Sequence, residues 1–139
     1  MNPFQVDSQQ TVLVEGLTGP NGADRLFITT GFAQLMGGGP SGAPQAFSGL
    51  IEPTLTAGQF RRAIATAAPA TLSVNQMTIP PIGATQRVYA RWAVNAVEAD
   101  WDDESGKIEL RFETTTNADT ALSAQVERLA FQVMVFAGP

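Results

Sequence analysis

The side chains whose types and spacing could support chemistry are a run of carboxylates between positions 98 and 104. Glu98, Asp100, Asp102, Asp103 and Glu104 occur within seven residues, and no basic residue lies among them. This run is interpreted first as a solvated acidic turn that keeps a hairpin edge from pairing with other strands. Hard cations are bound by several oxygen ligands held close together. The alternative is therefore a metal site for Ca²⁺, formed by Glu98, Asp100, Asp102 and Glu104.

The spacing of these carboxylates differs from that of an EF-hand loop. Asp100, Asp102 and Glu104 have the opening offsets of such a loop, but the glycine comes one place late, at Gly106. The twelfth position is Arg111, where an EF-hand has a bidentate glutamate. Any cation site in this run would therefore have a geometry of its own.

Trp101 lies inside the acidic run and could stack on a ligand. Together with Asp100 and Asp102 it forms a candidate binding site for a sugar or another small molecule. The competing interpretation is that Trp101 folds back over its own hairpin. Trp92 belongs to an apolar stripe and is assigned to the core, on the opposite strand face from Trp101 because the spacing between them is odd.

The composition excludes several kinds of chemistry. The chain has no cysteine and no histidine, which removes disulfides, thiolate zinc sites, cysteine nucleophiles and histidine-based triads. A Gly-rich stretch at 37–42 matches G-x-G-x-x-G, but no helix opens after it, so it is interpreted as a loop. We therefore predict that the protein is not an enzyme and needs no cofactor.

Net charge and hydropathy limit the partners. The net charge is −5, and the eight basic residues form no stripe, so nucleic acid is not expected as a partner. The sequence shows no signal peptide and no apolar run of about 18 residues, so membrane insertion is not expected. These features predict a soluble protein that is cytoplasmic or part of a larger particle.

The clearest structural signal is an antiparallel hairpin over residues 86–116. A polar stretch at 102–106 predicts its loop, and the return strand at 107–113 alternates apolar and charged residues. The apolar stripe of the first strand comprises Val88, Ala90, Trp92, Val94 and Ala96. On its other face, a cross-strand charge ladder is expected to join Arg87, Tyr89 and Arg91 to Glu109 and Glu113. Alternatively, Tyr89 and Arg91 contribute to a protein interface.

The segment Phe131–Phe136 is predicted to be a strand with two apolar faces. Phe131, Val133 and Val135 share one face, and Met134 and Phe136 share the other. One face of a sandwich strand usually meets water, so the second face needs cover. A loop, a helix or a partner subunit could supply this cover, and with a partner subunit Met134 and Phe136 would form the interface. Residues 119–130 fit either a helix or the start of the same strand, and the strand is favoured.

The rest of the chain predicts short strands separated by turns. Charged residues make up 15% of the sequence, below the usual share of about 25%, and glycine and proline are frequent. Strands are expected at 11–15, 25–30 with an extension to 35, 50–52 and 71–74, and one helix is expected at 57–67. The chain is therefore predicted to be one β-rich domain, residues 1–139, with an all-β fold. The expected architecture is an antiparallel β-sandwich or jelly roll with at most one or two short helices.

These features together favour a non-catalytic structural subunit that self-associates into a homo-oligomer through a β-sandwich. The alternative is a binding module for a sugar or another small ligand, with Ca²⁺ as a possible requirement. An enzyme is the least favoured of the three function classes. Without histidine and cysteine, catalysis would depend on carboxylates, Lys107, Tyr89 or a hydroxyl, and none of these lies in a recognisable catalytic arrangement.

Overall fold

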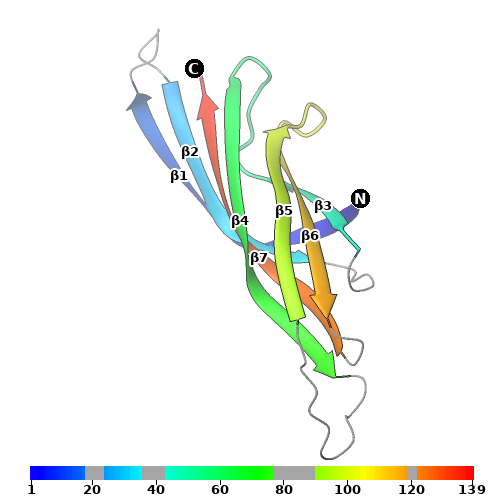
Figure 1. Ribbon diagram of the computed structural model, residues 1–139. Helices are drawn as coiled ribbons and strands as arrows, with labels where there is room; N and C mark the ends of the chain where they lie inside the picture. The colour runs from blue at the N-terminus through cyan, green and yellow to red at the C-terminus, as the bar shows by residue number, and fades with distance from the viewer. Residues whose placement is uncertain (18–23, 36–42, 77–89, 119–121) are drawn as a thin grey trace, which may run out of the picture.

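A computed structural model of the protein describes residues 1–17, 24–35, 43–76, 90–118 and 122–139. These residues form strands and their connections, with no helix among them (Figure 1). The described part accordingly contains no helix that is long and apolar enough to cross a membrane. The strands are β1 (Asn2–Leu17), β2 (Asp24–Leu35), β3 (Gln45–Ile51), β4 (Phe60–Gln76), β5 (Ala90–Trp101), β6 (Ile108–Ala118) and β7 (Leu122–Ala137).

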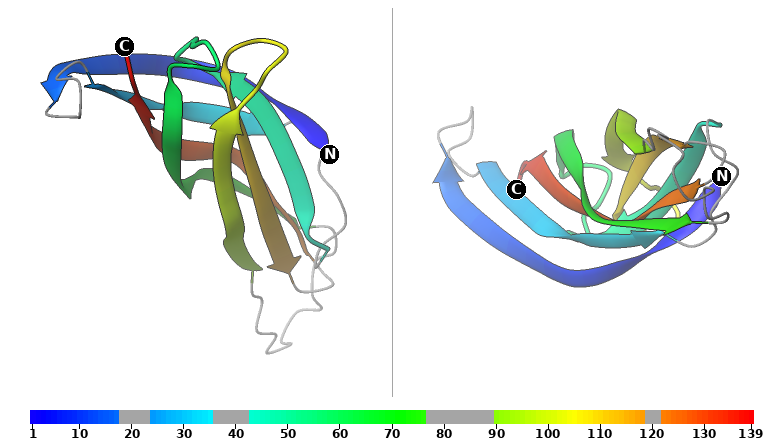
Figure 2. Two further views of the ribbon diagram at one scale, coloured as in Figure 1. Left: turned by 90° about the horizontal axis from the view of Figure 1, so that it is seen from above. Right: turned by 60° about the horizontal axis from the view of Figure 1, so that its bottom comes forward.

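The seven strands form one mixed sheet in the order β4-β7-β2-β1-β3-β6-β5. All neighbours are antiparallel except β1 and β3, which are parallel and share only the pairs Asn2↔Phe47 and Pro3↔Ser48. The sheet curls until its outer strands, β4 and β5, contact each other, so it is nearly closed into a barrel (Figure 2). The all-β prediction is confirmed. The two antiparallel halves of the sheet enclose the core as the layers of a sandwich do, yet they belong to one sheet.

The helix predicted at 57–67 is wrong, because this segment lies in and before β4. Residues 60–76 pair with β7 along nearly their whole length. Ala63, Ala65 and Ala67 alternate onto the core side and pack against it, while Ile64 and Thr66 lie on the other face. Alanine favours helices in isolation, but ladder hydrogen bonds and burial of every second residue override that preference here.

The ambiguous segment before Phe131 is a strand, as favoured from the sequence. β7 runs from Leu122 to Ala137, and its side chains at Leu129, Phe131, Val133 and Val135 are buried. The strand lies between β2 and β4 and pairs with both. Asp119 and Thr120, where a helix would begin, lie outside the described residues.

A bulge in β5 overturns the prediction that Trp92 and Trp101 lie on opposite faces. Val94 pairs with Thr114 and Ala96 with Glu113, so Asn95 is an extra residue in the strand. An extra residue shifts the two-residue alternation by one. The core-facing side chains therefore change from even to odd positions after the bulge: Trp92, Val94, Val97, Ala99 and Trp101 all pack against the core.

Three phenylalanine rings join the halves of the sheet near the parallel pair. Phe4 of β1 and Phe47 of β3 both stack on Phe112 of β6, with ring centroids 5.1 and 5.6 Å apart. The Phe4 ring lies over Gly49, where an added Cβ would come within 2.5 Å of the ring. A side chain at position 49 would therefore displace the ring that holds β1 against β3 and β6.

Candidate functional site

The carboxylates at the tip of the β5–β6 hairpin are engaged in local hydrogen bonds. Asp102 accepts hydrogen bonds from the backbone N–H of Ser105, at 2.9 Å, and from the Ser105 hydroxyl. These bonds from Ser105 lower the pKa of the Asp102 carboxyl. Asp100 accepts a hydrogen bond from the backbone N–H of Trp101 at 2.8 Å. The Asp102 side chain therefore stabilises the turn, whereas Asp100 bonds only to the residue next to it in β5.

The four carboxylates proposed as calcium ligands are not gathered around one point. Glu98 lies opposite Arg111 in the ladder and Asp100 lies opposite Glu109. Glu109, which pairs with Arg111 at 2.6 Å, raises the pKa of the Arg111 guanidinium, and Glu98 and Asp100 add to this effect. Residues 98–107 are all described, and the described residues include no group of three or more carboxylates placed to hold a metal ion. The geometry lends the cation site no support, and it stays a prediction.

Trp101 connects the hairpin tip to the loop that follows β3. Its indole N–H donates to the carbonyl oxygens of Leu55, at 3.1 Å, and Gly106, at 3.2 Å. The Leu55 N–H donates in turn to the Gly106 oxygen at 2.7 Å. The half-buried ring packs against the core. The polar atom of the side chain is thus used within the fold, as expected if Trp101 folds back over its hairpin.

The charge ladder predicted for β5 has a different register. Arg91 lies opposite Asn117, whereas Glu113 lies opposite Ala96. Glu113 instead accepts a hydrogen bond from the Asn95 side chain at 3.1 Å. The ladder from Arg91 to Glu113 is therefore wrong. Arg87 and Tyr89 lie outside the described residues, so the interface prediction for Tyr89 is not addressed.

Met134 and Phe136 lie in an apolar patch on the outer face of the four-stranded half β4-β7-β2-β1. Cross-strand pairing aligns the side chains of that face in rows. One row contains Val14, Leu26, Phe136 and Arg62, and the next contains Val12, Ile28, Met134 and Ile64. Val12 is 59% and Val14 37% exposed, and the other apolar members are half-buried. We call Val12, Val14, Leu26, Ile28, Ile64, Met134 and Phe136 the outer patch.

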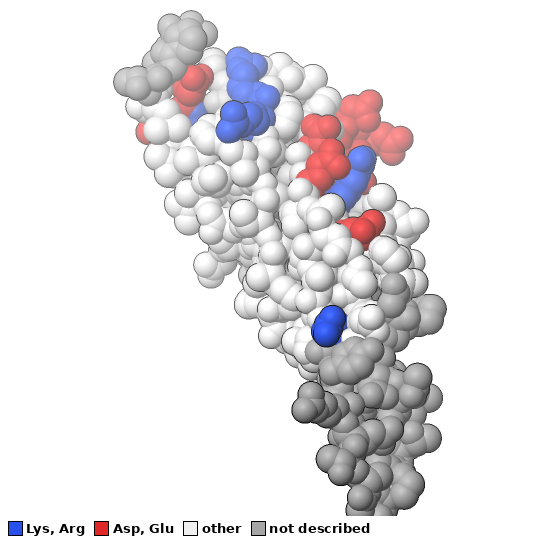
Figure 3. Space-filling model, in the orientation of Figure 1, with Lys and Arg blue, Asp and Glu red and all other residues white. Residues whose placement is uncertain are grey.

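Polar residues border the outer patch on the described strands. The Arg62 guanidinium lies over the Phe136 ring, 5.7 Å from its centroid. Farther along the same face, Arg128 pairs with Asp7 at 2.6 Å and lies over the Phe32 ring at 4.6 Å. In the view of Figure 3, basic side chains gather near the start of β4 and acidic ones near the β5–β6 tip, and the surface below these two groups is largely uncharged.

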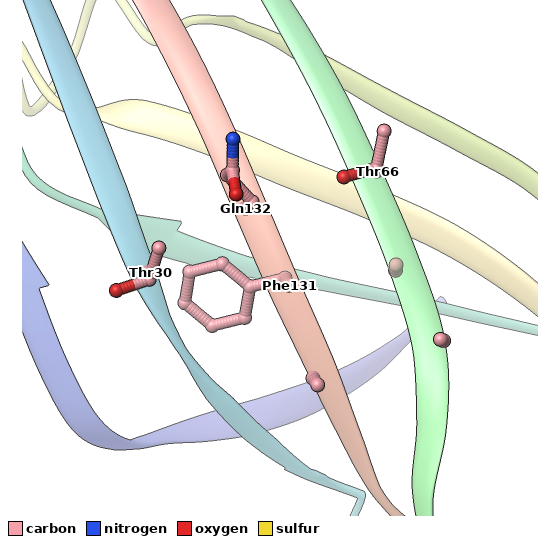
Figure 4. Close-up of a pocket in the computed structure, with 7 residues that line it drawn as sticks. Thr30, Thr66, Phe131 and Gln132 are labelled. Carbon is pink, nitrogen blue, oxygen red and sulfur yellow. The ribbon is translucent and has the colours of Figure 1, made fainter.

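A shallow depression of about 310 Å³ adjoins the outer patch. Its polar lining comes from one cross-strand row, Thr30, Gln132 and Thr66, and Ala68, Ala130 and Phe131 contribute apolar surface (Figure 4). None of its lining residues is charged. Neutral hydroxyl and amide groups offer hydrogen bonds to a partner surface, but they include no activated nucleophile and no general base.

The sequence identified only two of the seven outer-patch residues. The five others lie on β1, β2 and β4, and each is an ordinary apolar residue in its own strand. Their adjacency depends on the order β4-β7-β2-β1, which places distant segments side by side. No protein-family model matches the chain, and no curated protein or solved structure resembles it significantly.

Proposed function

We propose that this protein is a non-catalytic assembly subunit that forms homo-oligomers through the outer patch. The observation that carries the proposal is the position of the patch: seven apolar side chains lie together on the sheet face that points away from the core. Contiguous apolar patches with a polar border on a protein surface commonly mark protein interfaces.

The surroundings of the outer patch have the composition of a protein interface. Specific interfaces combine an apolar centre with a polar rim. Here the centre contains Met134, Phe136 and Ile28, and the rim contains Arg62 and the neutral row at Thr30 and Gln132. Arginine with neutral hydroxyl and amide groups can make hydrogen bonds at the rim without burying an unpaired charge.

The small-ligand alternative has weaker structural support. Trp101, its central residue, donates its indole N–H to two backbone carbonyls of the fold. Asp102 is similarly committed to Ser105. No observation in the described residues favours a sugar site over these local roles.

The test is the solution mass, measured by size-exclusion chromatography with light scattering over a range of concentrations. We expect the wild-type chain to form a defined oligomer and Met134→Asp to dissociate it, because an unpaired carboxylate at an apolar interface costs about 3 kcal/mol or more. Leu50→Asp is the control, since Leu50 is 44% exposed on β3, away from the outer patch. Circular dichroism establishes that both variants are folded.

Two results would contradict the proposal. One is a wild-type chain that stays monomeric at every concentration. The other is a folded Met134→Asp variant that keeps the wild-type oligomeric mass. Dissociation by Leu50→Asp and Met134→Asp alike would place the contact elsewhere on the molecule.

A further inference from the structure

One stretch of β1 has a free edge. Within residues 9–15, Gln10 to Val14 pair with β2 on one side, and β3 pairs with β1 only at Asn2 and Pro3. No described strand lies on the other side of residues 9–15, and Figures 1 and 2 show this part of β1 at the margin of the molecule. Every second residue of an edge strand directs its backbone N–H and C=O outward, where another strand can pair with them.

This free edge lacks the features that usually prevent pairing. Residues 9–15 carry no proline, and their single charged residue is Glu15 at one end. Val12, Leu13 and Val14 are 59%, 43% and 37% exposed, so apolar side chains are accessible on both strand faces. Charges, prolines and bulges are the usual protection of an edge. In β1 the backbone irregularities, which are the positive φ angles of Ser8 and Gly16, lie at the two ends of the free edge and do not interrupt it.

The other two outer strands of the sheet are protected. β4 carries Arg61, Arg62 and Pro69, and its pairing is irregular after Pro69. β5 carries Glu98 and Asp100 and contains a bulge, as described above. These two strands also contact each other. The edge of β1, whose single charge lies at its end, therefore differs from the rest of the sheet margin.

The free edge is also held in an extended conformation before any partner binds. The Gln9 side chain accepts a hydrogen bond from the backbone N–H of Glu52 at 2.9 Å. The hydroxyls of Thr11 and Thr29 are 3.0 Å apart, and Thr29 donates to the Glu52 carbonyl at 2.9 Å. An edge that is ordered in advance loses less conformational entropy when it pairs.

We infer that the β1 edge pairs antiparallel with the β1 edge of a second copy, about a two-fold axis at Leu13. This inference rests on the proposed function, because in both cases the partner is a second copy of the same chain. In this register Leu13 faces its counterpart and Val12 faces Val14 of the other copy. Apolar residues thus meet apolar residues on both faces of the joined sheet.

Charge supports the same arrangement. Glu15 would face Thr11 of the second copy, so the two Glu15 carboxylates stay apart. In-register parallel pairing would place them side by side, which is unfavourable. A two-fold axis perpendicular to the sheet leaves the outer faces of the two copies on the same side of the joined sheet. Val12 and Val14 belong to the outer patch, so the two patches would become one continuous apolar surface.

Cysteine cross-linking tests this pairing directly, because the chain contains no cysteine. Leu13→Cys places one thiol on the proposed axis, where directly opposed Cβ atoms are about 4.5–5.5 Å apart. Slight adjustment brings them to disulfide distance. Leu50→Cys is the matched control, with wild-type exposures of 44% at Leu50 and 43% at Leu13. Dimer formation is followed on non-reducing gels during mild oxidation with glutathione disulfide.

We expect Leu13→Cys to form the disulfide dimer at least about tenfold faster than Leu50→Cys, because paired edges hold the thiols at high effective concentration. Equal rates would overturn the pairing. Faster cross-linking of Val12→Cys than of Leu13→Cys would overturn the register.

The solution mass separates the two proposals. An oligomer that Met134→Asp dissociates, together with slow Leu13→Cys cross-linking, would refute edge pairing and leave the proposed function in place. A wild-type chain that is monomeric throughout would refute both.

Discussion

Replacing Trp101 by phenylalanine tests whether this residue serves the fold. The substitution removes the indole N–H that donates to Leu55 and Gly106. The Gly106 oxygen keeps the Leu55 N–H as a donor, whereas the Leu55 oxygen loses the one that Trp101 supplies. A hydrogen bond contributes about 0.5–1.5 kcal/mol net, and an unsatisfied carbonyl costs somewhat more. We expect Trp101→Phe to lower the free energy of unfolding by about 1–2 kcal/mol.

The structure supplies a matched control for this substitution. Trp92 lies in the same strand and also packs against the core, but its indole N–H has no hydrogen-bond partner among the described residues. Trp92→Phe deletes the same atoms without deleting a described hydrogen bond, and it removes a buried N–H that has no described partner, so it should cost less stability than Trp101→Phe. Urea unfolding followed by circular dichroism measures both variants. Equal stability of Trp101→Phe and Trp92→Phe would refute the assignment of Trp101 to the fold.

Two further substitutions test other contacts. Gly49→Ala should destabilise the protein by about 1–3 kcal/mol, because its Cβ would overlap the Phe4 ring; unchanged thermal melting would contradict this packing. The Lys107 ammonium, 2.9 Å away, is the main cause of the lowered pKa of Glu52, whose ordinary value is 4.5. Glu52 therefore contributes stability above pH 4.5 that is lost as the pH falls through its lowered folded pKa. Urea midpoints across this range should fall less steeply in Lys107→Gln, and identical profiles would count against the ion pair.

Local sequence signals predicted the β5–β6 hairpin well. The alternation of Ile108, Leu110 and Phe112 requires no knowledge of other strands, and all three side chains are buried. The polar stretch at 102–106 likewise forms the turn. The strand at 131–136 was also evident from local sequence, because its apolar residues follow one another directly in the chain.

The sequence failed where distant contacts decide the outcome. The Ala-rich start of β4 is a strand because β7, some 60 residues later, supplies its hydrogen bonds. Asn95 looks like any other strand residue, so nothing local revealed the bulge that brings Trp101 onto the face of Trp92. The predicted pairing of Arg91 with Glu113 was wrong because the hairpin register places Arg91 opposite Asn117.

The outer patch shows the same limit for the candidate site. The sequence identified Met134 and Phe136 as candidate contact residues because their strand is apolar on both faces. Val12, Ile28 and Ile64 join them only through the cross-strand rows, which depend on the strand order. A single sequence indicates that a surface needs cover, and the topology identifies the remaining residues of that surface.

The position of β7 has a consequence for biosynthesis. β7 is the last of the described strands in chain order, yet it lies inside the sheet and pairs with β2 and β4 on its two sides. During synthesis, the edges of β2 and β4 that pair with β7 stay unpaired until residues 122–137 have been synthesised. Strand pairing over such sequence separations is slow, taking milliseconds to seconds in small β proteins. Until residues 122–137 have been synthesised, Phe27 and the core-facing alanines of β4 lack the cover of β7, and apolar surface exposed in this way favours aggregation.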